Sequence, residues 1–277
     1  MNSKTVLHAV IGDPIAHSKS PLMMNRAFLE LGLNSAYAAF HVSPGQLPAA
    51  IAGVRAFGLR GLNVTIPHKE AVLPLLDELD ESARMIGAVN TIVNENGVLR
   101  GYNTDGIGYV RSLEEETGIE LSGKTVAVIG AGGAARAIVY ALAKRGVAQI
   151  WLVNRTLARA EELTQHFSQI CSIGVLSLEQ LPAHGHALDL LVNTTSVGMS
   201  PDVEQCPLQD LNWIDENIII SDLIYNPRVT KLMRLAAERG AKTHGGLGML
   251  VYQGACAFEY WTGMPAPVQV MWQAVTE

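Results

Sequence analysis

The residues best suited to chemistry lie in a glycine-rich turn near the middle of the chain. Gly130, Gly132 and Ala135 have the Gly-x-Gly-x-x-Gly/Ala spacing, and they follow a β-branched run at 126–129 that suits a buried parallel strand. The first glycine allows a tight bend, the second lets the backbone approach a pyrophosphate, and the third small residue lets the helix pack closely on the strand. N–H groups at the start of the following helix then face the phosphates.

The glycine turn predicts dinucleotide binding, although similar turns serve flavin and methyl-donor binders and some only turn the chain. The residues of this turn that are expected to bind the cofactor are Gly130, Ala131, Gly132, Gly133 and Ala134.

The next strand indicates which dinucleotide is bound. Residues 149–153 are apolar and run into Asn154-Arg155-Thr156, where an NAD site usually carries an acid for the ribose 2′-hydroxyl. No acid stands there, and Arg155 with Arg159 one helical turn later offers forked cationic donors that suit a 2′-phosphate. The sequence therefore favours NADP over NAD. The alternative is an exposed helix face that carries two arginines.

A second polar cluster ends an earlier predicted strand at 59–64. The run Asn63-Val64-Thr65-Ile66-Pro67-His68-Lys69 puts an amide, a hydroxyl, an imidazole and an amine where open α/β sheets bind ligands. A lysine on a loop is usually a solvated surface charge, and only its setting after a strand makes Lys69 a candidate for chemistry. Asp105 in Asn103-Thr104-Asp105-Gly106 precedes a predicted helix, where an N-cap is its competing or additional role.

Two serines lie just beyond the first predicted strand. Pro21 suits the first position of a helix, so Ser20 could act only as the N-cap of that helix. Ser18 is two residues too early to cap the same helix in the same way. Two hydroxyl groups converging past a strand end would suit a small carboxylate.

Two further patterns lead to negative predictions. Residues 118–125 fit the Gly-x4-Gly-Lys-Thr phosphate loop, but that loop must follow a strand and open a helix, whereas here the order is reversed. The histidines show neither His-x3-His nor His-Glu-x2-His spacing, so no metal is predicted. Cys171, Cys206 and Cys256 are too widely spaced for a disulfide framework or a zinc knuckle, which fits a reducing cytoplasm.

The composition predicts a cytoplasmic protein with a small-molecule substrate. With 277 residues, 48% of them hydrophobic and 17% charged, the chain can form the cores of two ordinary domains. A net charge of −6 argues against nucleic acid or an anionic membrane as the main partner. The first apolar run ends at Gly12-Asp13-Pro14, too early for a signal peptide, and no stretch suits a membrane span.

Strands and helices are predicted to alternate, which indicates an α/β fold with parallel sheets and, at the hairpin, one antiparallel pair. The expected strands are at 5–11, 36–40, 59–64, 87–93, 98–101, 126–129, 149–153, near 174, 188–193, 218–223 and 242–243. The expected helices are at 22–31, 45–57, 77–85, 107–116, after 132, 157–167, 230–239, around 252–253 and 267–275.

Together these motifs resemble those of the shikimate dehydrogenase family, the NADP-dependent reductases of the aromatic amino acid pathway. The motifs that carry the resemblance cover nearly the whole chain, at residues 18–21, 63–69, 87–91, 103–106, 130–136, 154–156 and 245–253. The resemblance implies a reversible oxidoreductase reaction, in which NADPH reduces 3-dehydroshikimate to shikimate. It also implies two domains with a cleft between them: an N-terminal open α/β substrate domain at 1–105, completed by 240–277, and a Rossmann-type doubly wound NADP domain at 106–239.

The resemblance further implies roles for single residues. Lys69 and Asp105 would form the acid–base pair, and Ser18 and Ser20 would hold the substrate carboxylate. Other substrate contacts are implied for Thr65, Asn90, Tyr225 and Gln253. Beyond the glycine turn, the implied cofactor contacts are Asn154, Arg155, Thr156, Arg159, Thr194, Leu223, Gly246 and Met249.

Two alternatives stay open at this point. The family includes quinate/shikimate dehydrogenases of broader substrate and cofactor use, which tend to carry an acid where this chain has Asn154-Arg155. A catalytically silent binding module that kept the fold is the other alternative, and the intact Lys69 and Asp105 speak against it. The protein is expected to be a monomer or a homodimer.

Overall fold

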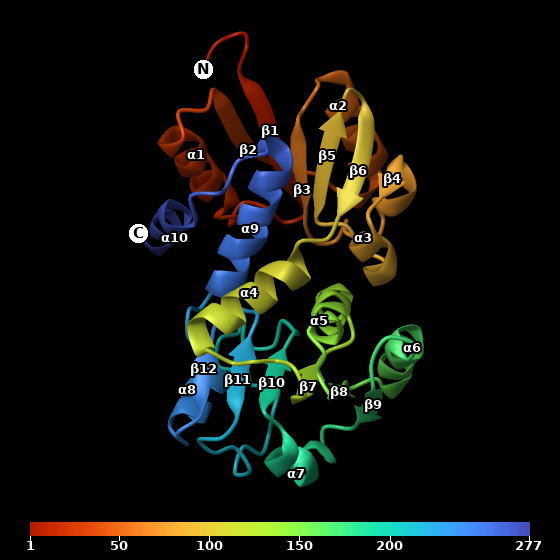
Figure 1. The fold of residues 1–277 in the computed structure, drawn as a ribbon, viewed down its shortest axis with the longest axis vertical. Helices are drawn as coiled ribbons and strands as arrows, with labels where there is room; N and C mark the ends of the chain where they lie inside the picture. The colour runs from red at the N-terminus through yellow and green to blue at the C-terminus, as the bar shows by residue number, and fades with distance from the viewer. The chain divides into compact units, whose positions relative to one another are not determined.

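The strands form two six-stranded sheets, each in its own structural unit (Figure 1). The computed structural model describes residues 1–277 and separates into unit 1, Met1–Gly108 with Val251–Glu277, and unit 2, Tyr109–Leu250. The chain passes between the units within α4 (Asp105–Thr117) and again within α9 (Gly246–Thr262). The predicted α/β class is therefore confirmed.

The sheet of unit 1 is mixed and has the strand order β2-β1-β3-β5-β6-β4. Its first three strands in sequence are parallel, as expected, while β5 runs antiparallel to both β3 and β6. The predicted hairpin is confirmed, because Asn96 and Gly97 have the positive φ angles, 56° and 92°, that a two-residue turn requires. The strands are β1 (Val6–Gly12), β2 (Ser35–His41), β3 (Gly61–Val64), β4 (Glu78–Leu79), β5 (Thr91–Glu95) and β6 (Val98–Tyr102).

Helices cover both faces of this sheet because its inner strands are apolar on both sides. On one face, Ala9 and Ile11 of β1 pack in a core with Ile51 and Val54 of α2 (Leu47–Ala56). On the other face, Trp261 of α9 lies against Gly61 so closely that an added Cβ would meet its ring at 2.3 Å. The other helices of unit 1 are α1 (Ser20–Glu30), α3 (Glu81–Ile86), α10 (Val268–Thr276) and two short 3-10 helices at Pro44–Gln46 and Leu73–Leu75.

The helix expected at 77–85 is wrong in its first half. Glu78 and Leu79 instead form the edge strand β4 beside β6, and the helix begins only after Asp80. Asp80 is the N-cap, since its carboxylate accepts a hydrogen bond from the Ala83 N–H at 2.9 Å. The sequence therefore contained the signal for the start of this helix, because aspartate is a preferred N-cap residue.

Unit 2 contains a fully parallel, doubly wound sheet with the order β12-β11-β10-β7-β8-β9, which confirms the predicted Rossmann-type architecture. The strand order reverses between β7 and β10, where such sheets bind ligands at the carboxyl ends of the strands. The strands are β7 (Thr125–Ile129), β8 (Gln149–Val153), β9 (Ile173–Leu176), β10 (Leu190–Asn193), β11 (Ile219–Asp222) and β12 (Lys242–His244). The helices besides α4 and α9 are α5 (Gly133–Lys144), α6 (Leu157–Phe167), the unexpected α7 (Leu181–His184) with the 3-10 turn Gly185–Ala187, and α8 (Lys231–Ala237).

The return of the chain to unit 1 occurs later than the expected boundary at residue 240. Residues 242–244 pair with β11 as the edge strand of unit 2. His244 also hydrogen-bonds the hydroxyls of Ser221 and Ser112, at 2.9 and 2.7 Å, which links β12 to β11 and α4. Two buried hydroxyl groups that satisfy both ring nitrogens explain why this strand stays with the second sheet.

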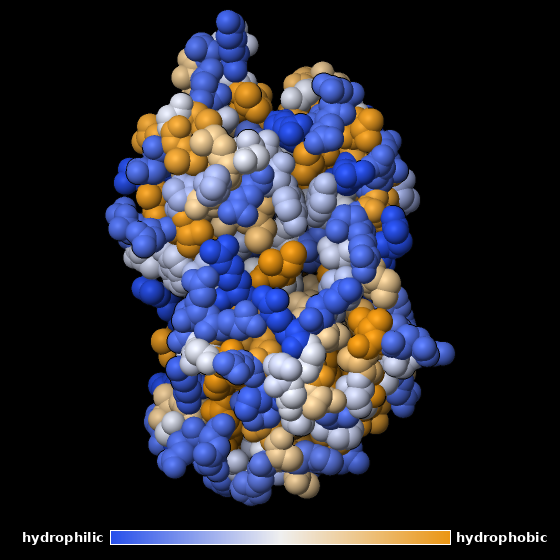
Figure 2. All heavy atoms as spheres, in the orientation of Figure 1, coloured by the Kyte–Doolittle hydropathy of each residue, from blue (hydrophilic) through white to orange (hydrophobic).

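The glycine- and lysine-containing segment at 118–125 does not form a phosphate loop. The helix α4 precedes it and β7 follows it, in the reversed order that the sequence indicates. Lys124 instead lies 2.9 Å from the carboxylate of Asp189. No helix has both the length and the apolar character needed to cross a bilayer. The face shown in Figure 2 is largely polar, with apolar residues scattered in small groups.

His8 in β1 gives unit 1 an acid-sensitive core. Its side chain is 3% exposed and its ring lies between Phe28 and Trp261, with ring centroids 4.8 and 5.1 Å away. Burial lowers the pKa of His8 to about 4, and the nearby charge of Arg60 acts in the same direction.

We expect His8 to reduce stability in acid. The unfolded chain takes up this proton near pH 6.5, while the folded chain resists it until about pH 4. His8 therefore leaves the free energy of unfolding unchanged above pH 6.5. It lowers that free energy by about 3 kcal/mol as the pH drops toward 4. His8→Leu should flatten this slope in urea titrations at pH 7 and 4.5, whereas the control His17→Leu, at an exposed position, should keep it. Equal slopes in the two variants would refute the assignment.

Candidate active site

Lys69 and Asp105 form a sheltered ion pair in unit 1. The Lys69 Nζ lies 2.5 Å from the Asp105 Oδ2, and the two side chains are only 23% and 8% exposed. Lys69 comes from the loop after β3, and Asp105 is the first residue of α4. The interpretation of Lys69 as a solvated surface charge is therefore wrong. A lysine and an aspartate this close make a charge-assisted hydrogen bond in a partly dry setting, which strengthens it.

Asn90 holds the second oxygen of that carboxylate. Its Nδ2 donates to the Asp105 Oδ1 at 2.7 Å, and it lies 3.4 Å from the Gln253 Oε1. The Oδ1 of Asn90 accepts a hydrogen bond from the Thr104 N–H at 2.8 Å. Because a backbone N–H can only donate, this contact fixes which end of the amide faces Asp105.

Asp105 does not act as an N-cap. Its own N–H donates to the side-chain oxygen of Asn103 at 3.1 Å, so Asn103 satisfies the first turn of α4. The Asp105 carboxylate is left to accept from Lys69 and Asn90. Asn103 and Thr104 were not predicted as individual supports of Asp105, although a run of polar residues before a helix is a visible signal in the sequence.

The serine pair has a similar outcome. Ser20 is the first residue of α1, Lys19 occupies the N-cap position, and no side chain caps the helix. The N-cap role for Ser20 is therefore wrong. The Ser18 Oγ accepts a hydrogen bond from the Ser20 N–H at 3.3 Å, and the Ser20 side chain is 8% exposed.

A buried polar network leads from the serines toward Asp105. Ser20 hydrogen-bonds the Tyr37 hydroxyl, which donates to the Asn63 Oδ1 at 2.7 Å. The Asn63 Nδ2 donates to the Thr91 Oγ1 at 3.1 Å, and Thr91 lies 3.2 Å from the Thr104 Oγ1 beside Asn90. Burial raises the pKa of Tyr37 well above its usual value, so its hydroxyl stays protonated as a donor. Tyr37 and Thr91 had no sequence signal, because tyrosine and threonine in strands usually serve packing.

The loop that carries Lys69 is anchored by close packing. An added Cβ on Gly12, at the end of β1, would meet the Thr65 Cγ2 at 2.5 Å. His68 is buried and its Nε2 lies 2.7 Å from the Val42 carbonyl oxygen. The imidazole therefore holds the loop in place, while Thr65 remains half-buried at its start.

In unit 2, the glycine turn has the shape that a dinucleotide needs. Gly130 has φ +113°, and an added Cβ would meet the Thr194 Oγ1 at 2.5 Å. Gly132 is the N-cap of α5 and would meet nothing within 4 Å. The backbone at the start of α5 is thus open to an anion, with N–H groups that no side chain caps. Ala135 is fully buried where α5 packs on the sheet.

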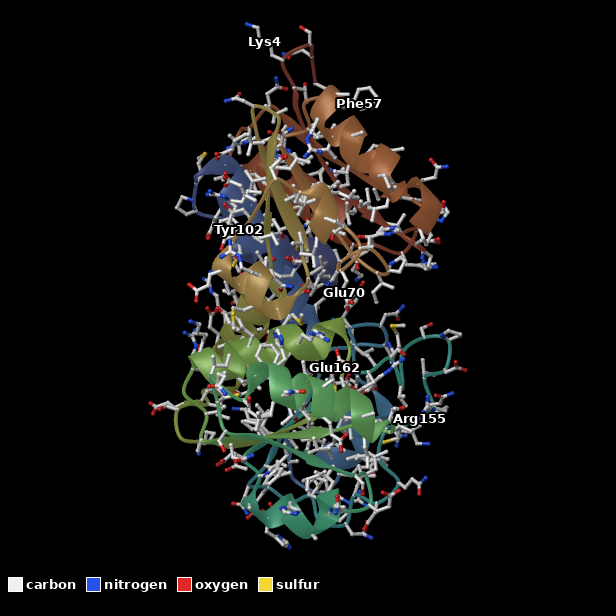
Figure 3. The ribbon with its side chains drawn as sticks, turned by 90° about the vertical axis from the view of Figure 1, so that its right-hand side faces the viewer. Lys4, Phe57, Glu70, Tyr102, Arg155 and Glu162 are labelled. Carbon is white, nitrogen blue, oxygen red and sulfur yellow. The ribbon has the colours of Figure 1, made fainter.

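The segment after β8 offers two unpaired cations. Asn154 braces the turn, since its Nδ2 donates to the Thr156 carbonyl oxygen at 2.8 Å, and Thr156 is the N-cap position of α6. Arg155 and Arg159 are exposed, and Figure 3 shows Arg155 at the periphery of this unit. Neither arginine is paired with an acid, which leaves both guanidinium groups available to a phosphate.

The remaining cofactor candidates of unit 2 lie after β10 and β11 or at the start of α9. Thr194 follows β10, and its Oγ1 donates to the Ile129 carbonyl oxygen at 2.7 Å. An added Cβ on Gly246 would lie 1.9 Å from the Leu223 carbonyl oxygen, so only glycine lets α9 start against that strand end. Met249 is in the first turn of α9. Tyr225 also belongs to unit 2, unlike the other substrate candidates, and burial raises the pKa of its hydroxyl.

No group of three or more His, Cys, Asp or Glu side chains is arranged to hold a metal ion. A doubly wound sheet with an open glycine turn, accompanied by an α/β unit that holds a sheltered lysine–aspartate pair, defines a two-domain nicotinamide-dependent dehydrogenase.

Comparison with known proteins identifies the family. The models of the shikimate dehydrogenase substrate binding domain, the shikimate / quinate 5-dehydrogenase and the shikimate 5'-dehydrogenase C-terminal domain match residues 10–92, 112–228 and 246–276. The chain belongs to the shikimate dehydrogenase family, as the sequence motifs predicted.

Relatives with known names are similar to this chain over nearly their full length. A shikimate dehydrogenase (NADP(+)) of Geobacillus sp. (strain WCH70) is 52% identical over 98% of both chains. The Listeria monocytogenes shikimate 5-dehydrogenase, solved with shikimate and NAD, is 39% identical, with a TM-score of 0.94 over 99% of this chain and 98% of that one. The Thermus thermophilus shikimate 5-dehydrogenase, solved with NADP(H) and shikimate, is 39% identical, with a TM-score of 0.89 over 98% of both chains.

The two glycines of the turn should respond differently to alanine. Gly130→Ala introduces a side chain at positive φ and against Thr194, which should cost about 1 to 3 kcal/mol of stability. Gly132→Ala meets open space, so the protein should keep most of its stability while losing affinity for NADPH. Thermal unfolding and fluorescence titration with NADPH separate the effects. A Gly132→Ala variant that binds NADPH normally would contradict a close approach of the cofactor there.

Proposed function

We propose that this chain catalyses the reversible reduction of 3-dehydroshikimate by NADPH to shikimate and NADP⁺, in aromatic amino acid biosynthesis. The observation that carries the proposal is the sheltered Lys69–Asp105 pair in a chain of this family. The open glycine turn before α5 and the unpaired arginines after β8 fit a dinucleotide with a 2′-phosphate.

The pair has two tasks in this reaction. NADPH supplies the hydride that adds to the carbonyl carbon, which leaves negative charge on the carbonyl oxygen. Lys69 stabilises that oxygen as an ammonium and donates the proton that completes the hydroxyl. In the reverse direction, the neutral amine of Lys69 takes the hydroxyl proton. Asp105 keeps Lys69 in position through the hydrogen bond between the two side chains.

The other polar groups of unit 1 hold the substrate. We assign its carboxylate to Ser18 and Ser20, which are adjacent at the start of α1. The ring hydroxyls are assigned to Thr65, Asn90, Asp105 and Gln253, of which Asn90 lies within 3.4 Å of the last two. Tyr225 is proposed as a further substrate contact from unit 2.

The setting is proposed to be the cytoplasm, with a monomer or homodimer that needs no nucleic acid or membrane partner. The three cysteines are free thiols, as a reducing compartment requires, and the net charge of −6 does not favour polyanions.

A second candidate is a quinate/shikimate dehydrogenase of broader use. The central family model covers both activities in its description, and one similar structure was solved with NAD. Rates with shikimate and quinate, each measured with NADP and NAD, distinguish the two. A catalytically silent binding protein would oxidise neither substrate with either cofactor.

Arg155→Ala should weaken NADP more than NAD. A charge-assisted bond to the 2′-phosphate contributes about 1.5 to 3 kcal/mol, so we expect a rise of roughly 10- to 100-fold in the KM for NADP and little change for NAD. Arg234→Ala, which removes an exposed arginine on α8, is the matched control and should affect neither. Steady-state kinetics with both cofactors provide the measurement. Equal losses for NADP and NAD with Arg155→Ala would disprove the assignment.

Lys69→Ala and Asp105→Ala should each lower kcat by roughly 10²- to 10⁴-fold while the fold stays intact. Because the residues act as a pair, the double variant should lose much less than the product of the single losses. Lys124→Ala removes the lysine of another Lys–Asp pair, 2.9 Å apart, and should keep kcat within a few-fold. The turnover rates are compared at saturating shikimate and NADP, and circular dichroism tests whether each variant is folded. Near-native turnover by Lys69→Ala would end the proposal.

A further inference from the structure

Asp222 is a fully buried carboxylate without a cationic partner. It ends β11, and its exposed fraction is 0%. Asn193 Nδ2 donates to both oxygens at 3.1 Å, Thr230 Oγ1 donates to Oδ2 at 2.8 Å, and the Ile224 N–H donates to Oδ1 at 3.0 Å. All three donors are neutral, and no lysine, arginine or histidine forms an ion pair with it.

The hydrogen bonds around Asp222 suit its ionised form. The Asn193 Oδ1 accepts from the Thr195 N–H at 3.0 Å, so the amide must turn its NH₂ group toward the carboxylate. The Ile224 N–H can only donate. Burial raises the pKa of Asp222, and these donors act against the rise. A buried charge with no counter-ion is costly, so a ligand that supplies a positive charge would relieve it.

The sheet register places Asp222 at the nicotinamide end of the dinucleotide site. Ile129, Asn193 and Asp222 are direct partners across β7, β10 and β11. Neighbouring strands lie about 4.8 Å apart, so Asp222 is about 10 Å along the sheet from the strand end that begins the glycine turn. The 2′-phosphate candidates lie on the other side of that turn, after β8. With the pyrophosphate at the turn, the nicotinamide half extends over β10 and β11.

We propose that Asp222 is a specificity-determining residue, whose negative charge raises the affinity for NADP⁺ relative to NADPH. The nicotinamide ring is positively charged in the oxidised cofactor and neutral in the reduced one. A fixed negative charge at this end of the sheet therefore distinguishes the two forms by electrostatics alone. This inference rests on the proposed NADP site.

The charge of Asp222 also affects the equilibrium between the bound substrates and the bound products. As hydride leaves the reduced ring, positive charge develops there, and the Asp222 carboxylate stabilises it. By linkage, any preference for bound NADP⁺ appears as an equal shift of the bound equilibrium toward shikimate. At an effective dielectric constant of about 20, one charge within about 10 Å of the ring changes the affinity ratio by roughly 15-fold or more.

The test measures the dissociation constants of NADP⁺ and NADPH by calorimetry for the whole protein and two variants. Asp222→Asn keeps the shape and removes the charge, and it should weaken NADP⁺ roughly tenfold or more relative to NADPH. Thr230→Val is the matched control, because it deletes one hydrogen bond to Asp222 and keeps the charge. It should lower stability and leave the affinity ratio unchanged.

Other outcomes separate the explanations. Equal weakening of both cofactor forms by Asp222→Asn would show that the carboxylate only stabilises the loops after β10 and β11 through its hydrogen bonds. That result would overturn the proposal. If Asp222→Asn does not fold, Asp222→Ser is the second variant, because it removes the charge and leaves room for water to accept the same hydrogen bonds. It should change the ratio of the NADP⁺ and NADPH affinities as Asp222→Asn does. Failure of both to fold while Thr230→Val folds also overturns it. A wild-type protein that binds neither cofactor form refutes the proposed function instead.

Discussion

The structure of unit 1 depends on keeping an ammonium and a carboxylate together in a sheltered place. Such a pair is favourable only when its remaining hydrogen-bonding groups are satisfied and its geometry is fixed. Asn90 occupies the second oxygen of Asp105, and the Thr104 N–H fixes the Asn90 amide in turn. Asn103 takes the helix N–H that would otherwise compete for the carboxylate. Each of these neighbours therefore restricts how the Lys69–Asp105 pair can rearrange.

Close backbone approach is the second constraint, and glycine meets it at three strand ends. Gly12 brings the end of β1 against the loop of Lys69, Gly130 lets β7 turn beneath Thr194, and Gly246 lets α9 begin against Leu223. In each case a Cβ would come within 2.5 Å of a neighbouring atom. The loops that carry the candidate site residues are therefore held by close contacts that leave the backbone little freedom.

The sequence predicted most of the fold because its strands carry strong local signals. The apolar run at 149–153 and the helix at 157–167 match β8 and α6 in their bounds. The segment at 77–85 failed because two residues that pair at a sheet edge have no periodicity of their own, and β6, their partner, is distant in sequence. For the same reason Tyr37 and Thr91 were missed, since a hydroxyl in a buried network looks like any strand residue until its partners are known. Ser20 and Asp105 looked like helix caps, and only the geometry showed that other groups fill those positions.

Two buried aspartates, Asp105 at the start of α4 and Asp222 at the end of β11, have different electrostatic surroundings. The charge of Asp105 is balanced within the protein by the ammonium of Lys69, whose Nζ lies 2.5 Å from the Asp105 Oδ2. Asp222 is surrounded only by neutral donors, which hold its shape and leave its charge uncompensated. If hydrogen bonding alone were required at β11, an asparagine with rearranged partners would avoid the cost of burying a charge. The buried carboxylate at the end of β11 therefore fits the proposed role of Asp222, in which its charge distinguishes the oxidised from the reduced cofactor.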